Sequence, residues 1–285
     1  MDNIIVGTDF SDESKPALAQ ALRVAKHSGG KLLLVHALDQ SLRDIYPEVL
    51  AKLEAVQAEC IAAGVDTKER VVIGYPDTSI PSTARDVNAD LVVVGTHGRT
   101  GVKRYLMGSV AERVVRSCET NVMVARERSA GEGGYKRVLV PTDFSQAAEN
   151  ALVTATRIAA PDAKVELFHA WQLPGAVTGY WGPAADNGAV LGPLRSQVVE
   201  AIEGQARRLL ERHTDLHPGI QFVDKEDVPT HAIRKQLEDG EYDLVVMGSH
   251  GRRGFRRWML GSVAEMTVRY APCSVLVVHA GEINE

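Results

Sequence analysis

The sequence predicts an α/β protein built from two tandem, doubly wound domains, each with a parallel sheet and helices on both faces. A chain of 285 residues is long for one such domain and natural for two of about 140 residues each. Apolar runs of strand length alternate with helical patterns, which favours parallel strands joined by right-handed crossovers. The stretch NIIVGTDFS at 3–11 also returns at 137–145 as RVLVPTDFS, an offset of 134. The second half therefore repeats the first.

The first repeat supplies its elements in a regular order. Its opening strand, about residues 3–8, leads to a helix capped by Ser11, where Asp12 and Glu13 suit the positive end of the helix dipole. Glycines at 29–30 end that helix. Beyond it we expect, in order, a strand at 31–35, a helix at about 47–63, a strand at 67–73, a short helix through residue 84, a strand at 91–94, a helix from residue 109 and a last strand at 121–125.

The repeat offsets also set the predicted domain boundaries. We expect a first domain at 1–128, a polar, glycine-rich linker at 129–135 and a second domain at 136–285. The later motifs recur at an offset of 153, which is 19 more than 134, so the second domain holds an insertion. We place the insertion at about 171–193, a stretch rich in glycine and proline. Its aromatic residues could cover a pocket, face a partner or pack against their own domain.

Composition narrows the class of protein. The formal net charge of −5 argues against a general nucleic-acid binder, whose affinity comes from a basic surface. The three cysteines lie far apart and outside any CxxC spacing, which favours a reducing compartment over a disulfide framework or a zinc site. No apolar run approaches the length of a membrane span. We therefore expect a soluble cytoplasmic protein with neither a nucleic-acid nor a membrane partner.

Each repeat carries a glycine-rich loop between a buried strand and a helix. The first loop reads GTHG at 95–98, then nine residues, then GS at 108–109. The second reads GSHG at 248–251, then nine residues, then GS at 261–262. Ser109 is expected to cap the helix that follows the first loop.

The physics of this unit favours an anion. Backbone N–H groups at the start of a helix lack intrahelical partners, and the helix dipole adds partial positive charge there. Glycines let the backbone come close to a ligand. We therefore predict that the loop binds phosphate. The alternative is that the glycines only form a tight turn and the basic residues form a solvated surface. The loops add the basic residues Arg99, Lys103, Arg104, Arg252, Arg253, Arg256 and Arg257.

A carboxylate follows the first strand of each repeat. Asp9 and Asp143 lie in the repeated TDFS motif. In an open parallel sheet ligands bind beyond the carboxyl ends of the strands, where the strand order reverses. If the first and fourth strands are neighbours there, the aspartate could accept hydrogen bonds from a base or ribose while the loop holds phosphates. The alternative is that these aspartates only form turns or caps ahead of Ser11 and Ser145.

With these motifs in place, the chain resembles a universal stress protein of the tandem, two-domain type, apart from the linker and the insertion. The resemblance implies a five-stranded sheet in the order 3-2-1-4-5, ATP binding with Mg²⁺ or Mn²⁺, and a homodimer formed through the fifth strands, here 121–125 and 274–279. It also implies a regulatory role with an unknown partner protein. The nucleotide-binding positions that it implies are Asp9, Ala37, Gly95, Gly98, Gly108, Ser109, Val110, Asp143, Ala170, Gly248, Gly251, Gly261, Ser262 and Val263.

Two departures separate the repeats. Gly7 in the first repeat corresponds to Pro141 in the second, which is a mild change. The Gly74-Tyr75-Pro76 sequence after the third strand becomes Asp227-Val228-Pro229. A carboxylate there would repel phosphate if it faced the pocket, so the first site is the better predicted of the two.

Other mechanisms fit the spacing less well. The chain lacks GxxxxGK[ST] and has no GxGxxG after its first strand, so neither a P-loop NTPase nor a dinucleotide oxidoreductase is predicted. His97 and His250 have no sequence-adjacent acid or second metal ligand. Without an evident general base, we expect an ATP-binding regulator with at most slow hydrolysis. A phosphotransferase or hydrolase that uses ATP with a divalent metal, and a nucleotide-free interaction scaffold, remain the alternatives.

Overall fold

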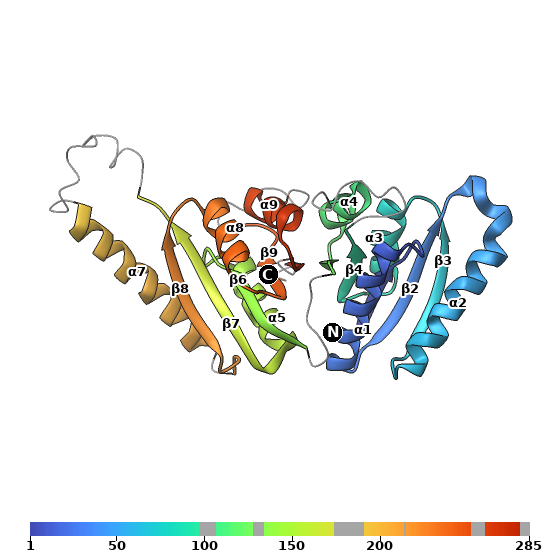
Figure 1. The fold of residues 1–285 in the computed structure, drawn as a ribbon, viewed down its shortest axis with the longest axis horizontal. Helices are drawn as coiled ribbons and strands as arrows, with labels where there is room; N and C mark the ends of the chain where they lie inside the picture. Colours follow the sequence, from blue (N-terminus) through green and yellow to red (C-terminus); the bar gives the residue numbers. More distant parts are fainter. Residues whose placement is uncertain (97–106, 128–133, 174–190, 214, 252–259, 280–285) are drawn as a thin grey trace.

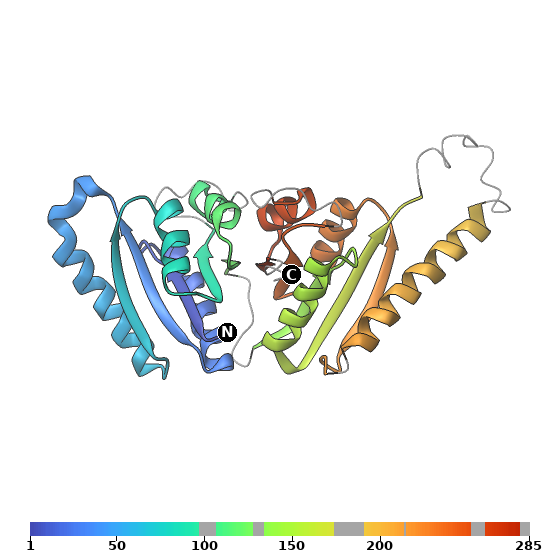
Figure 2. The same ribbon diagram turned by 180° about the vertical axis from the view of Figure 1, so that it is seen from behind.

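A computed structural model describes residues 1–96, 107–127, 134–173, 191–213, 215–251 and 260–279. Figure 1 and Figure 2 show the fold from opposite sides. Strands and helices alternate through both repeats, as the sequence predicted. No helix in these ranges combines the length and apolar character needed to cross a membrane.

Local sequence sets the ends of several elements in the first repeat. Proline stands in the first turn of α1 and of α3, where its missing N–H costs nothing. Gly29 ends α1 with a φ of 69°, a left-handed conformation that glycine adopts without strain. The elements are β1 (Asn3–Gly7), the 3-10 helix η1 (Asp12–Ser14), α1 (Lys15–Ser28), β2 (Lys31–Leu38), the 3-10 helix η2 (Gln40–Ile45), α2 (Tyr46–Ala62), β3 (Thr67–Ile73), α3 (Pro76–Asp86), β4 (Leu91–Gly95), α4 (Ser109–Ser117) and β5 (Asn121–Ala125).

The second repeat follows the same order. Its described elements are β6 (Tyr135–Pro141), α5 (Gln146–Ile158), β7 (Ala159–Trp171), α7 (Leu191–Arg212), β8 (Ile220–Glu226), α8 (Pro229–Asp239), β9 (Leu244–Gly248), α9 (Ser262–Tyr270) and β10 (Ser274–Val278). β6 begins at Tyr135, the last residue of the predicted linker. Part of the predicted insertion is helix: α7 starts at Leu191 and has 22 residues, against 17 in α2. Residues 174–190 lie outside the described ranges.

The strands of each repeat have the predicted order, but they form one sheet. The order is β3-β2-β1-β4-β5-β10-β9-β6-β7-β8, so two 3-2-1-4-5 halves meet at their fifth strands. Neighbouring strands are parallel within each half, and β5 pairs with β10 in the antiparallel sense. The predicted five-stranded parallel sheet of each domain is therefore present, and the two join into a single mixed sheet of ten strands.

This pairing also changes the expected mode of association. The family resemblance implies that the fifth strands join two chains, yet Val124, Met123 and Val122 pair with Val275, Leu276 and Val277 of the same chain. Each of these two strands has its other edge on β4 or β9. Both edges are therefore used within one molecule, and a homodimer through free β5 edges is not available to this fold.

Each face of the sheet carries one continuous apolar layer. On one face, α1, α2, α5 and α7 pack on the sheet through residues such as Ala21, Leu53, Leu152 and Leu209. On the other, α3, α4, α8 and α9 pack through Ile80, Val114, Ile233 and Val268. Both layers run through the two repeats without a break, so the halves share one core and not merely a strand pair.

Side chains at the centre of the molecule tie the two repeats together. The Arg126 guanidinium donates to the last carbonyls of α9, on Val268 and Arg269, at 2.8 and 3.0 Å. In Figure 1, α4 and α9 lie side by side, and Arg116 of α4 forms a 3.0 Å ion pair with Glu265 of α9. The chain thus builds internally the kind of interface that two single domains would build by pairing.

Candidate functional site

The predicted residues of the first site meet at the carboxyl edge of the sheet. β1 has β2 on one side and β4 on the other, so the strand order reverses at β1. Asp9 follows β1, Gly95 ends β4, and Ala37 lies near the end of β2. The second repeat places Asp143, Gly248 and Ala170 in the same way around β6. The structure therefore brings the aspartate, the first loop glycine and the alanine of each repeat to a topological switch point.

The turn after each first strand is strained and tightly bonded. Phe10 and Phe144 have φ angles of 64° and 61°, values that non-glycine residues rarely adopt. Their amides donate to the Oγ1 atoms of Thr8 and Thr142 at 3.1 and 3.0 Å. The same unusual backbone in both repeats shows that the TDFS motif encodes one specific turn.

The two aspartates take part in this turn. Asp9 Oδ1 accepts from the Ser11 amide at 3.1 Å and from its hydroxyl at 2.6 Å. Asp143 Oδ1 accepts from the Ser145 amide at 3.1 Å. The turn-forming role that the sequence left open is thus present in both repeats. The caps differ: Ser145 caps α5 through the Ala148 amide, whereas Ser11, contrary to expectation, makes no side-chain cap.

A histidine supports each turn, and sequence reasoning missed this role. Nδ1 of His36 donates to the Thr8 carbonyl at 2.8 Å, and Nδ1 of His169 donates to the Thr142 carbonyl at 2.7 Å. The Phe10 ring stacks on His36 with 4.7 Å between centroids. The available signal was the recurrence of a histidine at the same place in the second strand of both repeats.

The helices after the glycine loops begin on glycine. Gly108 and Gly261 are the N-caps of α4 and α9, with φ of −66° and −63° and no side-chain cap hydrogen bond. Ser109 and Ser262 are therefore the first helical residues, which corrects the expectation that Ser109 is the cap. The first backbone N–H groups of a helix lack intrahelical partners, and a glycine N-cap offers them no side-chain acceptor, so they are suited to binding an anion.

Backbone contacts hold each loop end in place. The Gly108 amide donates to the Thr96 carbonyl at 2.7 Å, and the Gly261 amide donates to the Ser249 carbonyl at 2.9 Å. In the second repeat a Cβ atom at Gly251 would lie 2.6 Å from Asp143 Oδ2. The loop backbone therefore comes against the carboxylate, and a side chain at 251 would require Asp143 to shift. Gly98, His97 and the basic residues of both loops lie outside the described ranges.

The departure at Asp227 has a local explanation. Asp227 accepts from the Val228 amide at 2.7 Å, and its other oxygen lies 2.6 Å from His231 Nδ1. The hydrogen bond from His231 holds the pKa of Asp227 below its usual range. The equivalent Gly74 has a φ of +144°. The second repeat thus replaces a glycine turn with a carboxylate engaged at the start of α8.

His250 is a weak candidate for acid–base chemistry. Its Nδ1 lies 3.0 Å from Ser249 Oγ, and burial lowers its pKa. Its Nε2 is buried without a hydrogen-bond partner in the described part of the chain. Within the same ranges, no group of three or more His, Cys, Asp or Glu side chains could hold a metal ion.

Comparisons with known proteins agree with this architecture. The model of the universal stress protein family matches residues 1–126 and 134–279. A Staphylococcus epidermidis protein that carries the same family name is 32% identical over 155 residues, covering 49% of this chain and 92% of its own. A Staphylococcus aureus counterpart is 33% identical over 138 residues, covering 44% and 83%. A universal stress protein from Archaeoglobus fulgidus has a crystal structure that superposes with a TM-score of 0.70 and 21% identity, covering 98% of each chain.

Proposed function

The chain belongs to the universal stress protein family, and from that premise we propose that each repeat binds ATP, with Mg²⁺ or Mn²⁺, at the carboxyl edge of its sheet. The observation that carries the proposal is a helix that starts on an uncapped glycine at the end of one strand, beside an aspartate at the end of its neighbour. The arrangement occurs in both repeats. A helix start attracts phosphate, and a neighbouring carboxylate suits the hydroxyl or amino groups of a nucleoside.

Different residues would contact different parts of the nucleotide. The first amides of α4 and α9 would hold phosphate oxygens, and the glycines before them leave room for close approach. Asp9 and Asp143 would accept hydrogen bonds from the nucleoside, and the backbone at Ala37 and Ala170 would contact adenine. The complete set is Asp9, Ala37, Gly95, Gly98, Gly108, Ser109, Val110, Asp143, Ala170, Gly248, Gly251, Gly261, Ser262 and Val263.

We propose binding and regulation as the role of these sites, with at most slow hydrolysis. A general base for water needs a group that titrates near neutral pH and reaches the ligand. His250, the one titratable loop residue within the described ranges, has its pKa lowered by burial. Occupancy would instead alter contacts with a regulatory protein partner. The three cysteines are free and buried, which suits the reducing cytoplasm.

The test is a calorimetric titration of the full chain with ATP and Mg²⁺. Gly108→Lys and Gly261→Lys place a long side chain at each helix start. Neither glycine has a positive φ, so the new side chain should obstruct the ligand without straining the backbone. Gly204→Lys is the control, because this glycine lies within α7, and a Cβ there would meet only the end of the Arg208 side chain at 3.6 Å.

The expected result is two ATP sites per chain, with one lost in each loop variant and both kept in the control. Loss of the only site with Gly108→Lys would restrict ATP to the first repeat. Absence of binding to the wild-type chain at millimolar ATP would overturn the proposal in favour of a nucleotide-free scaffold. The protein should first be checked for nucleotide carried through purification.

A further inference from the structure

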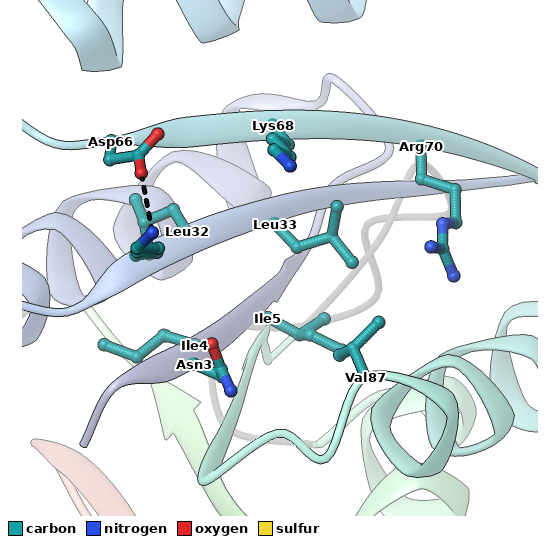
Figure 3. A pocket seen from close by; sticks show the side chains of 10 residues that line it. Asn3, Ile4, Ile5, Leu32, Leu33, Asp66, Lys68, Arg70 and Val87 are labelled. Carbon is teal, nitrogen blue, oxygen red and sulfur yellow. Dashed lines mark ion pairs between the residues drawn. The ribbon is translucent and has the colours of Figure 1, made fainter.

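An open pocket of about 270 Å³ lies on the first repeat, away from the proposed nucleotide site. It is lined by the beginnings of β1 and β2, by β3 and by the residue after α3 (Figure 3). The nucleotide residues follow the opposite ends of these strands. The pocket is therefore separate from the nucleotide site, and a ligand in it would not depend on the proposed function.

The pocket combines an apolar floor with a cationic rim. Ile5, Leu33 and Val87 form the floor, and Figure 3 shows Lys68 and Arg70 extending from β3 beside it. These two cations alternate along the strand with residues of the opposite face, so both belong to the face that carries the pocket. A ligand could therefore place an apolar part on the floor and a negatively charged group beside the cations of the rim.

The rim carries an excess of positive charge. Lys31, Lys68 and Arg70 line the pocket together with a single carboxylate, Asp66. Lys31 pairs with that carboxylate at 3.3 Å. Lys68 and Arg70 are exposed and form no ion pair in the described part of the chain. Two cations thus remain to attract an anion.

The second repeat has the same fold but fills the corresponding space. Ala89 corresponds to Tyr242, whose ring is buried and lies 5.7 Å from the Arg137 guanidinium carbon. Val87 corresponds to Gly240, and a Cβ there would lie 2.2 Å from the Tyr242 ring. Where the first repeat has Val87 and Ala89, the second has Gly240 and Tyr242. The glycine leaves room for the tyrosine ring, and the ring occupies the space that corresponds to the pocket.

The polar and charged lining also changes between the repeats. Leu33 corresponds to Glu166, which accepts from Gln236 Nε2 at 2.7 Å, and the same Nε2 donates to the Tyr242 hydroxyl at 2.9 Å. Lys68 and Arg70 correspond to Gln221 and Val223. The second repeat thus lacks the open floor and both unpaired cations.

We propose that this pocket of the first repeat binds a small amphipathic organic anion, with its apolar part on Ile5, Leu33 and Val87 and its acidic group between Lys68 and Arg70. The volume lies just below the roughly 300–1,000 Å³ of pockets for drug-sized ligands, which suits a small molecule. Charge complementarity selects an anion over a cation or a neutral ligand.

Calorimetric titration of the full chain with octanoate tests the proposal. Acetate carries the charge without the apolar body, and octylamine carries the body with the opposite charge. We expect octanoate to bind once per chain, and neither acetate nor octylamine to bind detectably. Saturating ATP should leave the octanoate affinity unchanged.

Two variants transfer the second-repeat residues into the pocket. Val87→Gly with Ala89→Tyr should fill it and abolish octanoate binding. Lys68→Gln with Arg70→Val should weaken binding about tenfold, since it removes two solvent-exposed ionic contacts. Arg70→Lys, which keeps the charge, is the matched control. Thermal unfolding and ATP titration verify that each variant is folded.

Equal octanoate affinity in the wild type and the filled variant would overturn the proposal. Competition between octanoate and ATP would do the same, because it would move the anion to the nucleotide site. If a hexaglutamate peptide binds and octanoate does not, the proposal is wrong, and the ligand of the pocket is an acidic protein segment.

Discussion

The second residue before the third helix of each repeat shows how the two halves differ. In the first repeat Gly74 turns the chain with a φ of +144°, whereas Asp227 in the second bonds the amide just before α8 and His231. A similar exchange replaces the small side chain of Ala89 with the buried ring of Tyr242. The strand order, the strained turns after the first strands and the glycine N-caps are the same in both repeats.

This pattern indicates which parts of the fold accept change. The turn after the first strand is kept in both halves because one strained backbone conformation, at Phe10 and Phe144, fixes several groups at once. The segments around the third helix differ because each exchange there is met by a local adjustment, such as the bond from His231 to Asp227 or the glycine beside the Tyr242 ring. Four sets of substitutions test this difference between the repeats, and the largest effect is expected at Tyr242.

Replacing Tyr242 with alanine should lower the free energy of unfolding by about 3–5 kcal/mol, because it removes a buried aromatic ring. Tyr242→Phe keeps the ring and loses the hydrogen bonds of the hydroxyl with Gln236 and Glu166, which should cost about 1–2 kcal/mol. Urea unfolding measures both. A cost below about 1 kcal/mol for the alanine variant would show that the ring does not fill a space in the second repeat.

Arg126 and His279, which follow the two central strands, differ in how they respond to pH. Arg126 is charged at any ordinary pH and bonds the end of α9. His279 Nε2 is buried without a partner in the described part of the chain, and burial, with His250 nearby, lowers its pKa to about 4. The histidine should therefore make stability depend on pH, whereas the arginine should not.

Linkage sets the sign of this pH effect. Above about pH 6.5, His279 is neutral in the folded and unfolded states, and its stabilising contribution is fully present. As the pH falls towards 4, the unfolded chain binds the proton first, so up to about 3 kcal/mol of stability is lost. His279→Gln should lose less stability between pH 7 and pH 4 than the wild type. Parallel curves of unfolding free energy for the two proteins would contradict this assignment.

Substitutions at Gly74 and Asp227 should differ in cost. Gly74→Ala should cost about 1–3 kcal/mol, because the backbone is unfavourable for alanine and the new Cβ would lie 2.8 Å from Ser79 Oγ. Asp227→Ala loses only its hydrogen bonds with the Val228 amide and with His231, and should cost less. Thermal unfolding gives the order of the two costs, and the reverse order would show that the aspartate contributes more to its turn than the glycine does.

The sequence alone predicted the order of the elements and the position of each aspartate and first loop glycine at the carboxyl edge of the sheet. Alternating strands and helices and the repeated TDFS and glycine motifs suffice for a doubly wound fold with an aspartate beside a helix start. Local patterns could not show that β5 and β10 pair within one chain, because an apolar edge strand pairs equally well with a second molecule. Nor could they show that Tyr242 fills a space that Ala89 leaves open, since that depends on how α8 packs.

The helix start illustrates the same limit at single-residue scale. Ser109 has the residue type and spacing of a cap, yet Gly108 takes the cap position with extended backbone angles. The loop closes through its own backbone bond from Gly108 to Thr96. Tertiary contacts of the loop therefore decided the boundary, and they left the helix start without a side-chain cap.

The smallest predicted effect concerns the charged network between α4 and α9. Arg116 lies 3.0 Å from Glu265, and the symmetric pair, Arg269 and Glu112, is separated by 3.5 Å. All four side chains are about one third exposed. A double-mutant cycle on each pair, with glutamine substitutions, should give coupling energies of about 0.2–1 kcal/mol that fall as salt is added.

The Arg116–Glu265 coupling should be the larger of the two, because its atoms are closer and charge-assisted hydrogen bonds weaken with distance. Equal couplings would mean that the repeats meet symmetrically in solution despite their different third helices. The differences between the repeats would then stay local, on the outer strands and helix starts, without reaching the interface between the repeats. A larger coupling for Arg269 and Glu112 would contradict the order that the two distances predict.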